Sequence, residues 1–90
     1  MTRDQLTAAA NTLQSAAGEA TDEETRDRLQ TQSAQFAALA DAERGPDHGK
    51  LARHEHVLTE IADDTGGEVE AAIEDALESI RAYRETVEGV

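Results

Sequence analysis

Apolar residues recur at spacings of three and four along almost the whole chain, and this pattern predicts an all-helical protein. Each of four stripes would lie on one face of a helix. Because no segment alternates as a strand does, we expect an all-α fold with helices at about 3–19, 22–44, 47–64 and 67–88. The stripes are Leu6, Ala9, Ala10, Leu13, Ala16, Ala17; Leu29, Ser33, Phe36, Leu39, Ala40; Leu51, His54, Leu58, Ile61, Ala62; and Val69, Ile73, Ala76, Leu77, Ile80, Tyr83, Val87.

The expected helix starts carry residues that can satisfy free backbone N–H groups. A threonine followed three residues later by Gln or Glu fits the capping box, and it precedes three of the stripes, as Thr2–Gln5, Thr21–Glu24 and Thr65–Glu68. The connections are short, which favours antiparallel neighbours. We therefore predict one domain over residues 1–90, an up-down-up-down four-helix bundle made of two helical hairpins.

Charge is the strongest signal in the composition. Twenty Asp and Glu face eight Lys and Arg, for a net charge of −12. Such a charge repels nucleic acid and anionic lipid, so we expect no nucleic-acid and no membrane partner. At molar salt the Debye length falls to about 3 Å and self-repulsion is screened. The composition is typical of cytoplasmic proteins of salt-accumulating archaea. An ordinary acidic mesophilic protein is the alternative.

Other features agree with a cytoplasmic chain. The sequence has no cysteine, which excludes disulfides and thiolate–zinc sites. It has no apolar run of the ~18 residues that a membrane span needs. Its start, MTRDQLTAAANTL, lacks the basic region and apolar core of a secretion signal.

The segment GPDHGKLARHEH, residues 45–56, holds the only proline, the only lysine and all three histidines. Gly45 and Pro46 suit the end of the second helix. Asp47 is a good N-cap for the third helix, with its carboxylate meeting the N–H of Gly49 or Lys50. This corner does not need His48, and Gly49 in a first turn costs helix stability unless something must approach the backbone closely.

The histidines give a weak metal signal. His54 lies on the apolar stripe, and its plainest interpretation is a partly buried residue hydrogen-bonded across the bundle. His56 lies about 200° around the helix from His54, so the two cannot chelate one ion. His56 and Glu60 form an i,i+4 pair that suits a surface contact better than a metal site. The candidate metal ligands are Asp47, His48, His54 and His56, and we expect no cofactor.

Catalytic patterns are lacking. The chain has no cysteine nucleophile, no GxSxG and no phosphate-binding glycine loop, and its serines have no histidine nearby in sequence. Acid pairs occur throughout and are most simply solvated surface. We therefore expect a protein that is not an enzyme.

Two segments, RGPDHGKLARH at 44–54 and GEVEAAIEDALESIRAYRETVEGV at 67–90, resemble a group of short haloarchaeal proteins that form a domain of unknown function. The resemblance covers the chain from TRDQL onward. It implies an all-helical cytosolic domain in a high-salt cell, and it implies no activity, ligand or catalytic residue.

Three functions remain open from the sequence. The first is a non-enzymatic module that contacts itself or another protein, suggested by apolar positions such as Tyr83 and Val87 that extend along the last helix. The second is a weak metal or small-ligand binder at the corner of the second and third helices. The third is an acidic mimic of nucleic acid.

Overall fold

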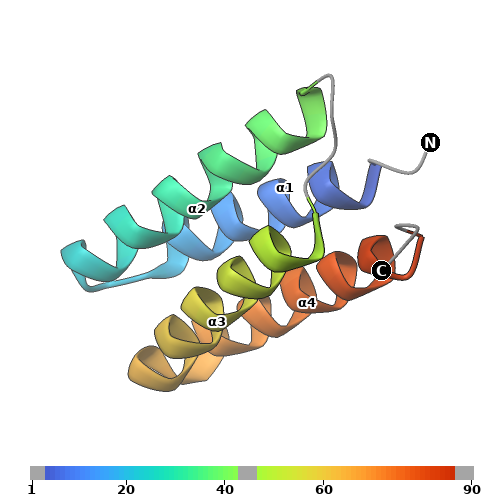
Figure 1. The fold of residues 1–90 in the computed structure, drawn as a ribbon. Coiled ribbons are helices and arrows are strands. Elements are labelled where there is room, and N and C mark those ends of the chain that lie inside the picture. The colour runs from blue at the N-terminus through green and yellow to red at the C-terminus, as the bar shows by residue number, and fades with distance from the viewer. Residues whose placement is uncertain (1–3, 43–46, 87–90) are drawn as a thin grey trace.

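The computed structural model describes residues 4–42 and 47–86, and it confirms the predicted all-α bundle (Figure 1). The described residues form four helices and no strand: α1 (Asp4–Glu19), α2 (Glu23–Asp41), α3 (His48–Thr65) and α4 (Gly67–Arg84). α1 packs closely against both α2 and α4, and α3 packs against α4. The contact between α2 and α3 is the slightest of these, so one side of the bundle is loosely closed.

The predicted stripes form the core. All of their described members are buried except Leu39, Ala40 and His54, which are half-buried, and Val87 lies outside the described residues. The core gains Ala20 and the polar Gln32. The buried hydroxyl of Ser33 is satisfied, because it donates to the carbonyl of Ala10 at 2.8 Å. This hydrogen bond joins α2 to α1.

Two helices end earlier than predicted. α2 stops at Asp41, and Ala42 is already extended with φ −73° and ψ 152°. Leu39 and Ala40 are the last residues of α2 that pack against the core. An aspartate at a helix C-terminus is also unfavourable toward the helix dipole. The expected stop at Gly45 and Pro46 lies outside the described residues.

α4 ends at Arg84 rather than at residue 88. Tyr83 is its last buried residue in the part of the chain that the structure describes. Beyond it, the N–H and the hydroxyl of Thr86 both donate to the carbonyl of Tyr83, at 2.9 and 2.7 Å. These tighter i→i−3 bonds replace the α-helical pattern.

Two of the predicted capping boxes are wrong, and that of Thr2 falls outside the described residues. The N-cap of α2 is Asp22, not Thr21. Its carboxylate accepts from the N–H of Thr25 at 2.9 Å and from the Thr25 hydroxyl at 3.1 Å, and these two bonds lower the pKa of Asp22. Thr65 is the last residue of α3, and Gly66 alone joins α3 to α4. Gly66 and Gly67 have φ of 69° and 65°, which residues with a Cβ rarely adopt, so backbone geometry makes this turn.

None of the helices, over the residues described, has the length and apolar character needed to cross a lipid bilayer.

Candidate functional site

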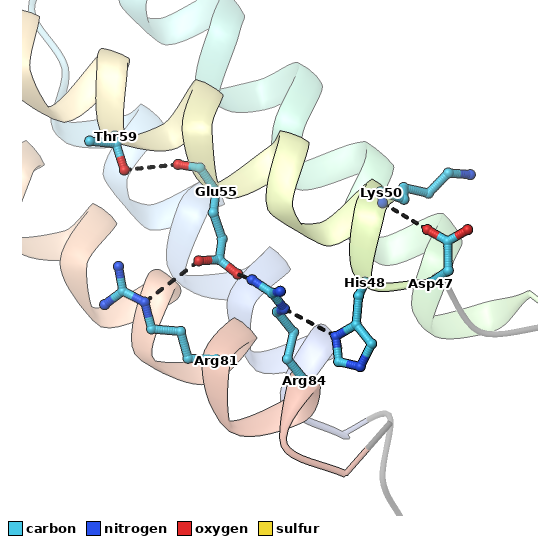
Figure 2. Close-up of polar contacts among 7 residues, drawn as sticks. All are labelled: Asp47, His48, Lys50, Glu55, Thr59, Arg81 and Arg84. Carbon is cyan, nitrogen blue, oxygen red and sulfur yellow. Dashed lines mark hydrogen bonds and ion pairs between the residues drawn. The ribbon is translucent and has the colours of Figure 1, made fainter. Parts of the chain in front are cut away.

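The start of α3 is capped as predicted. Asp47 is the N-cap, and its carboxylate accepts from the N–H of Lys50 at 2.8 Å (Figure 2). Gly49 is not required sterically, because a Cβ at this position would meet only Asp47 Oδ1, at an ordinary 3.6 Å. No close approach to the backbone therefore explains Gly49 within residues 4–42 and 47–86.

A carboxylate on α3 holds the end of α4 (Figure 2). Glu55 has a side chain only 15% exposed, and its Oε2 accepts from Arg84 Nη1 at 2.7 Å. Arg81 Nε lies 3.6 Å from the other carboxylate oxygen. The same Arg84 donates from Nε to His48 Nδ1 at 3.4 Å. Glu55, Arg81, Arg84 and His48 thus form one network, which we call the Glu55 cluster, and it fastens the last turn of α4 to the first half of α3.

His54 lies on the opposite side of α3, toward α2. Its Nδ1 is 2.8 Å from Gln32 Oε1, and its ring contacts Phe36 with centroids 4.8 Å apart and planes tilted by 55°. Gln32 is buried, and its carbonyl oxygen makes Nδ1 the protonated nitrogen of the neutral ring. The interpretation of His54 as a partly buried residue hydrogen-bonded across the bundle is confirmed.

The three histidines are not brought together. His48 faces α4, His54 faces α2, and His56 is exposed beside Glu60, with His56 Nε2 3.5 Å from Glu60 Oε2. Asp47 is occupied in capping α3. Within the described part of the chain, no three His, Asp or Glu side chains gather closely enough to hold a metal ion.

Burial gives His54 a pH dependence. Desolvation is the main cause that lowers its pKa, and the nearby charges of Lys50 and Arg53 lower it further. A histidine whose pKa is lower in the folded state binds protons more readily when unfolded. Its contribution to stability is therefore intact above the unfolded pKa, about 6.5, and is lost as the pH falls from there through the lower pKa of the folded state.

We expect the free energy of unfolding of the native protein to fall between pH 7.5 and 5.5 relative to that of the variant His54→Gln. Urea unfolding at a series of pH values in molar KCl measures the free energy of unfolding of each protein. The carboxylates titrate alike in both proteins, so their contribution cancels in the difference. His56→Gln is the matched control, because His56 is exposed, and it should keep the native pH dependence. Equal pH slopes for the native protein and His54→Gln would contradict the assignment.

Clefts on the surface of the described residues include three that could hold a small molecule. The largest, about 500 Å³, lies where the α1–α2 and α3–α4 turns meet and carries four carboxylates and Arg28. Those carboxylates belong to Glu19, Asp22, Glu24 and Asp64. The second lies between α1 and α2, and the described residues that line it are all uncharged, namely Gln14, Gln30, Ser33, Ala34 and Ala37. The third lies between α2 and α3, beside His54.

The uncharged cleft belongs to a wider surface that the apolar pattern does not reveal. Residues 5–18 and 29–40 contain no Asp, Glu, Lys or Arg. Gln14 of α1 and Gln30, Ala34 and Ala37 of α2 line this cleft together. We call these residues, together with the exposed Thr7, Ala8, Asn11 and Ser15 of the same charge-free stretch of α1, the uncharged face. The signal is visible in the sequence as two long gaps in the distribution of charge.

The Glu55 cluster could not be found from the sequence. Glu55 is one of twenty acidic residues, and Arg81 and Arg84 follow it by more than twenty positions. Only the packing of α3 on α4 distinguishes them. Gln32 does carry a sequence signal that Gln30 and Gln35 lack: it lies three residues after Leu29 and four before Phe36, which places it on the buried stripe.

The fold and these contacts define a small antiparallel helical bundle in which the polar clusters join helices together. The chain belongs to a family of unknown function (DUF7553), whose model matches residues 1–86. No curated protein and no solved structure is significantly similar to it. The expected membership of an uncharacterised domain is thereby confirmed, whereas a haloarchaeal origin and a family motif at RGPDHGKLARH remain predictions.

Proposed function

We propose that the protein is a non-enzymatic module of a high-salt cytoplasm and that it acts by self-association through the uncharged face. The observation that carries this proposal is a charge-free surface on a chain with a net charge of −12. Depletion of charged residues is the compositional mark of the centre of a protein–protein interface. Tyr83, which suggested an interaction surface on the last helix, is buried in the core and is not available to a partner.

The charge distribution favours a second copy over a basic partner. A basic partner would be drawn to the carboxylates of α3 and α4, such as Glu70, Glu74 and Glu78, which line one side of α4. A second copy carries the same negative charge, so two chains repel each other on every acidic surface. The uncharged face is where they can meet without bringing carboxylates together, and a two-fold axis would pair it with itself.

Small side chains suit this contact as well. Ala34 and Ala37 are exposed and line the groove between α1 and α2 together with Gln14 and Gln30. Alanine allows helices to approach closely, and the two amides can hydrogen-bond across a symmetric interface. Screening at molar salt removes the remaining repulsion between the two chains, so association should strengthen as salt rises.

The test is sedimentation equilibrium in molar KCl over a wide range of protein concentration. We expect a dimer of the native protein, with a dissociation constant raised at least about tenfold by Ala37→Glu, because like charges placed opposite one another are strongly unfavourable. Ala71→Glu is the matched control, since Ala71 is an exposed alanine on α4, and it should leave the dissociation constant within about twofold.

A native protein that is monomeric at every concentration would overturn this proposal. So would an equal weakening by Ala37→Glu and Ala71→Glu, because that result would show a general effect of charge and not an interface. Circular dichroism of both variants verifies that the helices are intact.

A further inference from the structure

The cleft between α2 and α3 differs from the rest of the surface in its charge. It has a volume of about 360 Å³ and is lined by Gln35, Ala38 and Leu39 of α2 and by Lys50 and His54 of α3. None of the described residues that line it carries a carboxylate, although the chain has twenty acidic residues. It lies where the bundle is least tightly closed, since α2 and α3 make the slightest contact of the packed helix pairs.

Two basic side chains on this part of α3, Lys50 at the cleft and Arg53 one turn further along, have no acidic partner among the described residues. Elsewhere in residues 4–42 and 47–86 the arginines are bonded: Arg26 to the carbonyl of Ala20, Arg28 to Asp64, and Arg81 and Arg84 to Glu55. The side chains of Lys50 and Arg53 form no hydrogen bond and no ion pair with any of the described residues. In an acidic chain, two unneutralised cations one helical turn apart make a local positive region.

His54 lies close to both of these basic residues. Burial is the main cause that lowers the pKa of His54, and the charges of Lys50 and Arg53 lower it further. On α2 the ring contacts the uncharged side chains of Gln32 and Phe36. Among the described residues, the lining of the cleft therefore contributes the positive charge of Lys50 and no negative charge.

We infer that the α2–α3 cleft binds a small organic monocarboxylate, with the carboxylate at the Lys50 ammonium and the apolar body against Ala38, Leu39 and the His54 ring. An ammonium acts as a single point charge, which matches one negative charge. The apolar lining favours a hydrocarbon or aromatic body over a bare inorganic anion. Polyanions are disfavoured because the carboxylates of the surrounding surface repel them.

The experiment uses phenylacetate as the probe and the full chain in molar KCl at neutral pH. NMR signals of the Leu39 methyl groups and the His54 ring report on the cleft. We expect saturable shifts of both, and we expect Lys50→Gln to weaken phenylacetate binding by up to about fivefold, the range of a partly exposed ion pair. Arg53→Gln is the control, because Arg53 does not line the cleft, and it should change affinity by less than about twofold.

Neutral and inorganic probes separate the two parts of the inference. Phenylacetamide has the same shape without the charge, and phosphate has charge without an apolar body, so both should bind more weakly than phenylacetate. The inference is overturned if phenylacetamide or phosphate binds equally well. It is also overturned if Lys50→Gln leaves the affinity unchanged, or if Arg53→Gln reduces it as much. Circular dichroism verifies that both variants keep the native helix content.

Discussion

Replacing Phe36 with alanine is expected to lower the free energy of unfolding by about 3–5 kcal/mol. Phe36 is fully buried and is the largest of the fully buried side chains. Its removal loses the transfer free energy of the ring and leaves a cavity that an alanine-rich core has few bulky side chains to fill. A small domain has only about 5–10 kcal/mol of stability in total, so this one change would remove a large part of it.

Urea unfolding in molar KCl measures the loss. Leu39→Ala is the control on the same helix, because Leu39 is only half-buried, and we expect it to cost about 1 kcal/mol. A second readout is the ring of His54, which packs on Phe36. In the alanine variant its NMR titration should move toward that of a solvated histidine, because the ring loses the phenyl group that shields it from solvent. A loss below about 2 kcal/mol would mean that the neighbouring helices collapse into the space.

Glu55→Ala should cost about 2 kcal/mol, the second large effect. The carboxylate is mostly buried, and its loss leaves Arg84 without its 2.7 Å partner and Arg81 without its nearest carboxylate. A charge-assisted bond of this kind is stronger than a neutral one, and a partly buried pair is screened little by salt. We therefore expect the cost to persist in molar KCl.

Glu60→Ala is the matched control, because Glu60 lies on the same helix and pairs with an exposed histidine. It should cost less than about 0.5 kcal/mol. A double-mutant cycle of Glu55→Ala with Arg84→Ala isolates the pair. A coupling energy near zero, or equal losses in Glu55→Ala and Glu60→Ala, would show that the Glu55 cluster does not fasten α4 to α3.

The sequence predicted the helices well because burial follows a periodic pattern that local residues carry. The stripe from Leu51 to Ala62, including the half-buried His54, is confirmed residue by residue. Helix ends were predicted less well. Thr21 and Thr65 have the right side chains for caps, but Asp22 and Gly66 take those positions. The choice between neighbouring caps depends on a few tenths of a kcal/mol and on where core packing stops.

The candidate site shows the same division. The N-cap role of Asp47 follows from local chemistry, because a carboxylate and an N–H three residues apart always lie within reach. The partners of His48 and His54 could not be predicted from local chemistry, because they lie on α4 and α2, 36 and 22 residues away in the sequence. Side-chain spacing around α3 shows that His54 and His56 point apart, but it does not say what each one meets.

By itself the sequence determined an acidic all-helical hairpin pair and the side of each helix that is buried, because periodicity and charge are properties of the chain alone. The tertiary structure decided which helices pack tightly and where α2 and α3 leave a cleft. It also decided that Glu55, Arg81 and Arg84 meet, and that the charge-free stretches of α1 and α2 form one surface. These features depend on contacts between residues far apart in the chain. Such contacts contribute to stability only once the helices are packed against one another.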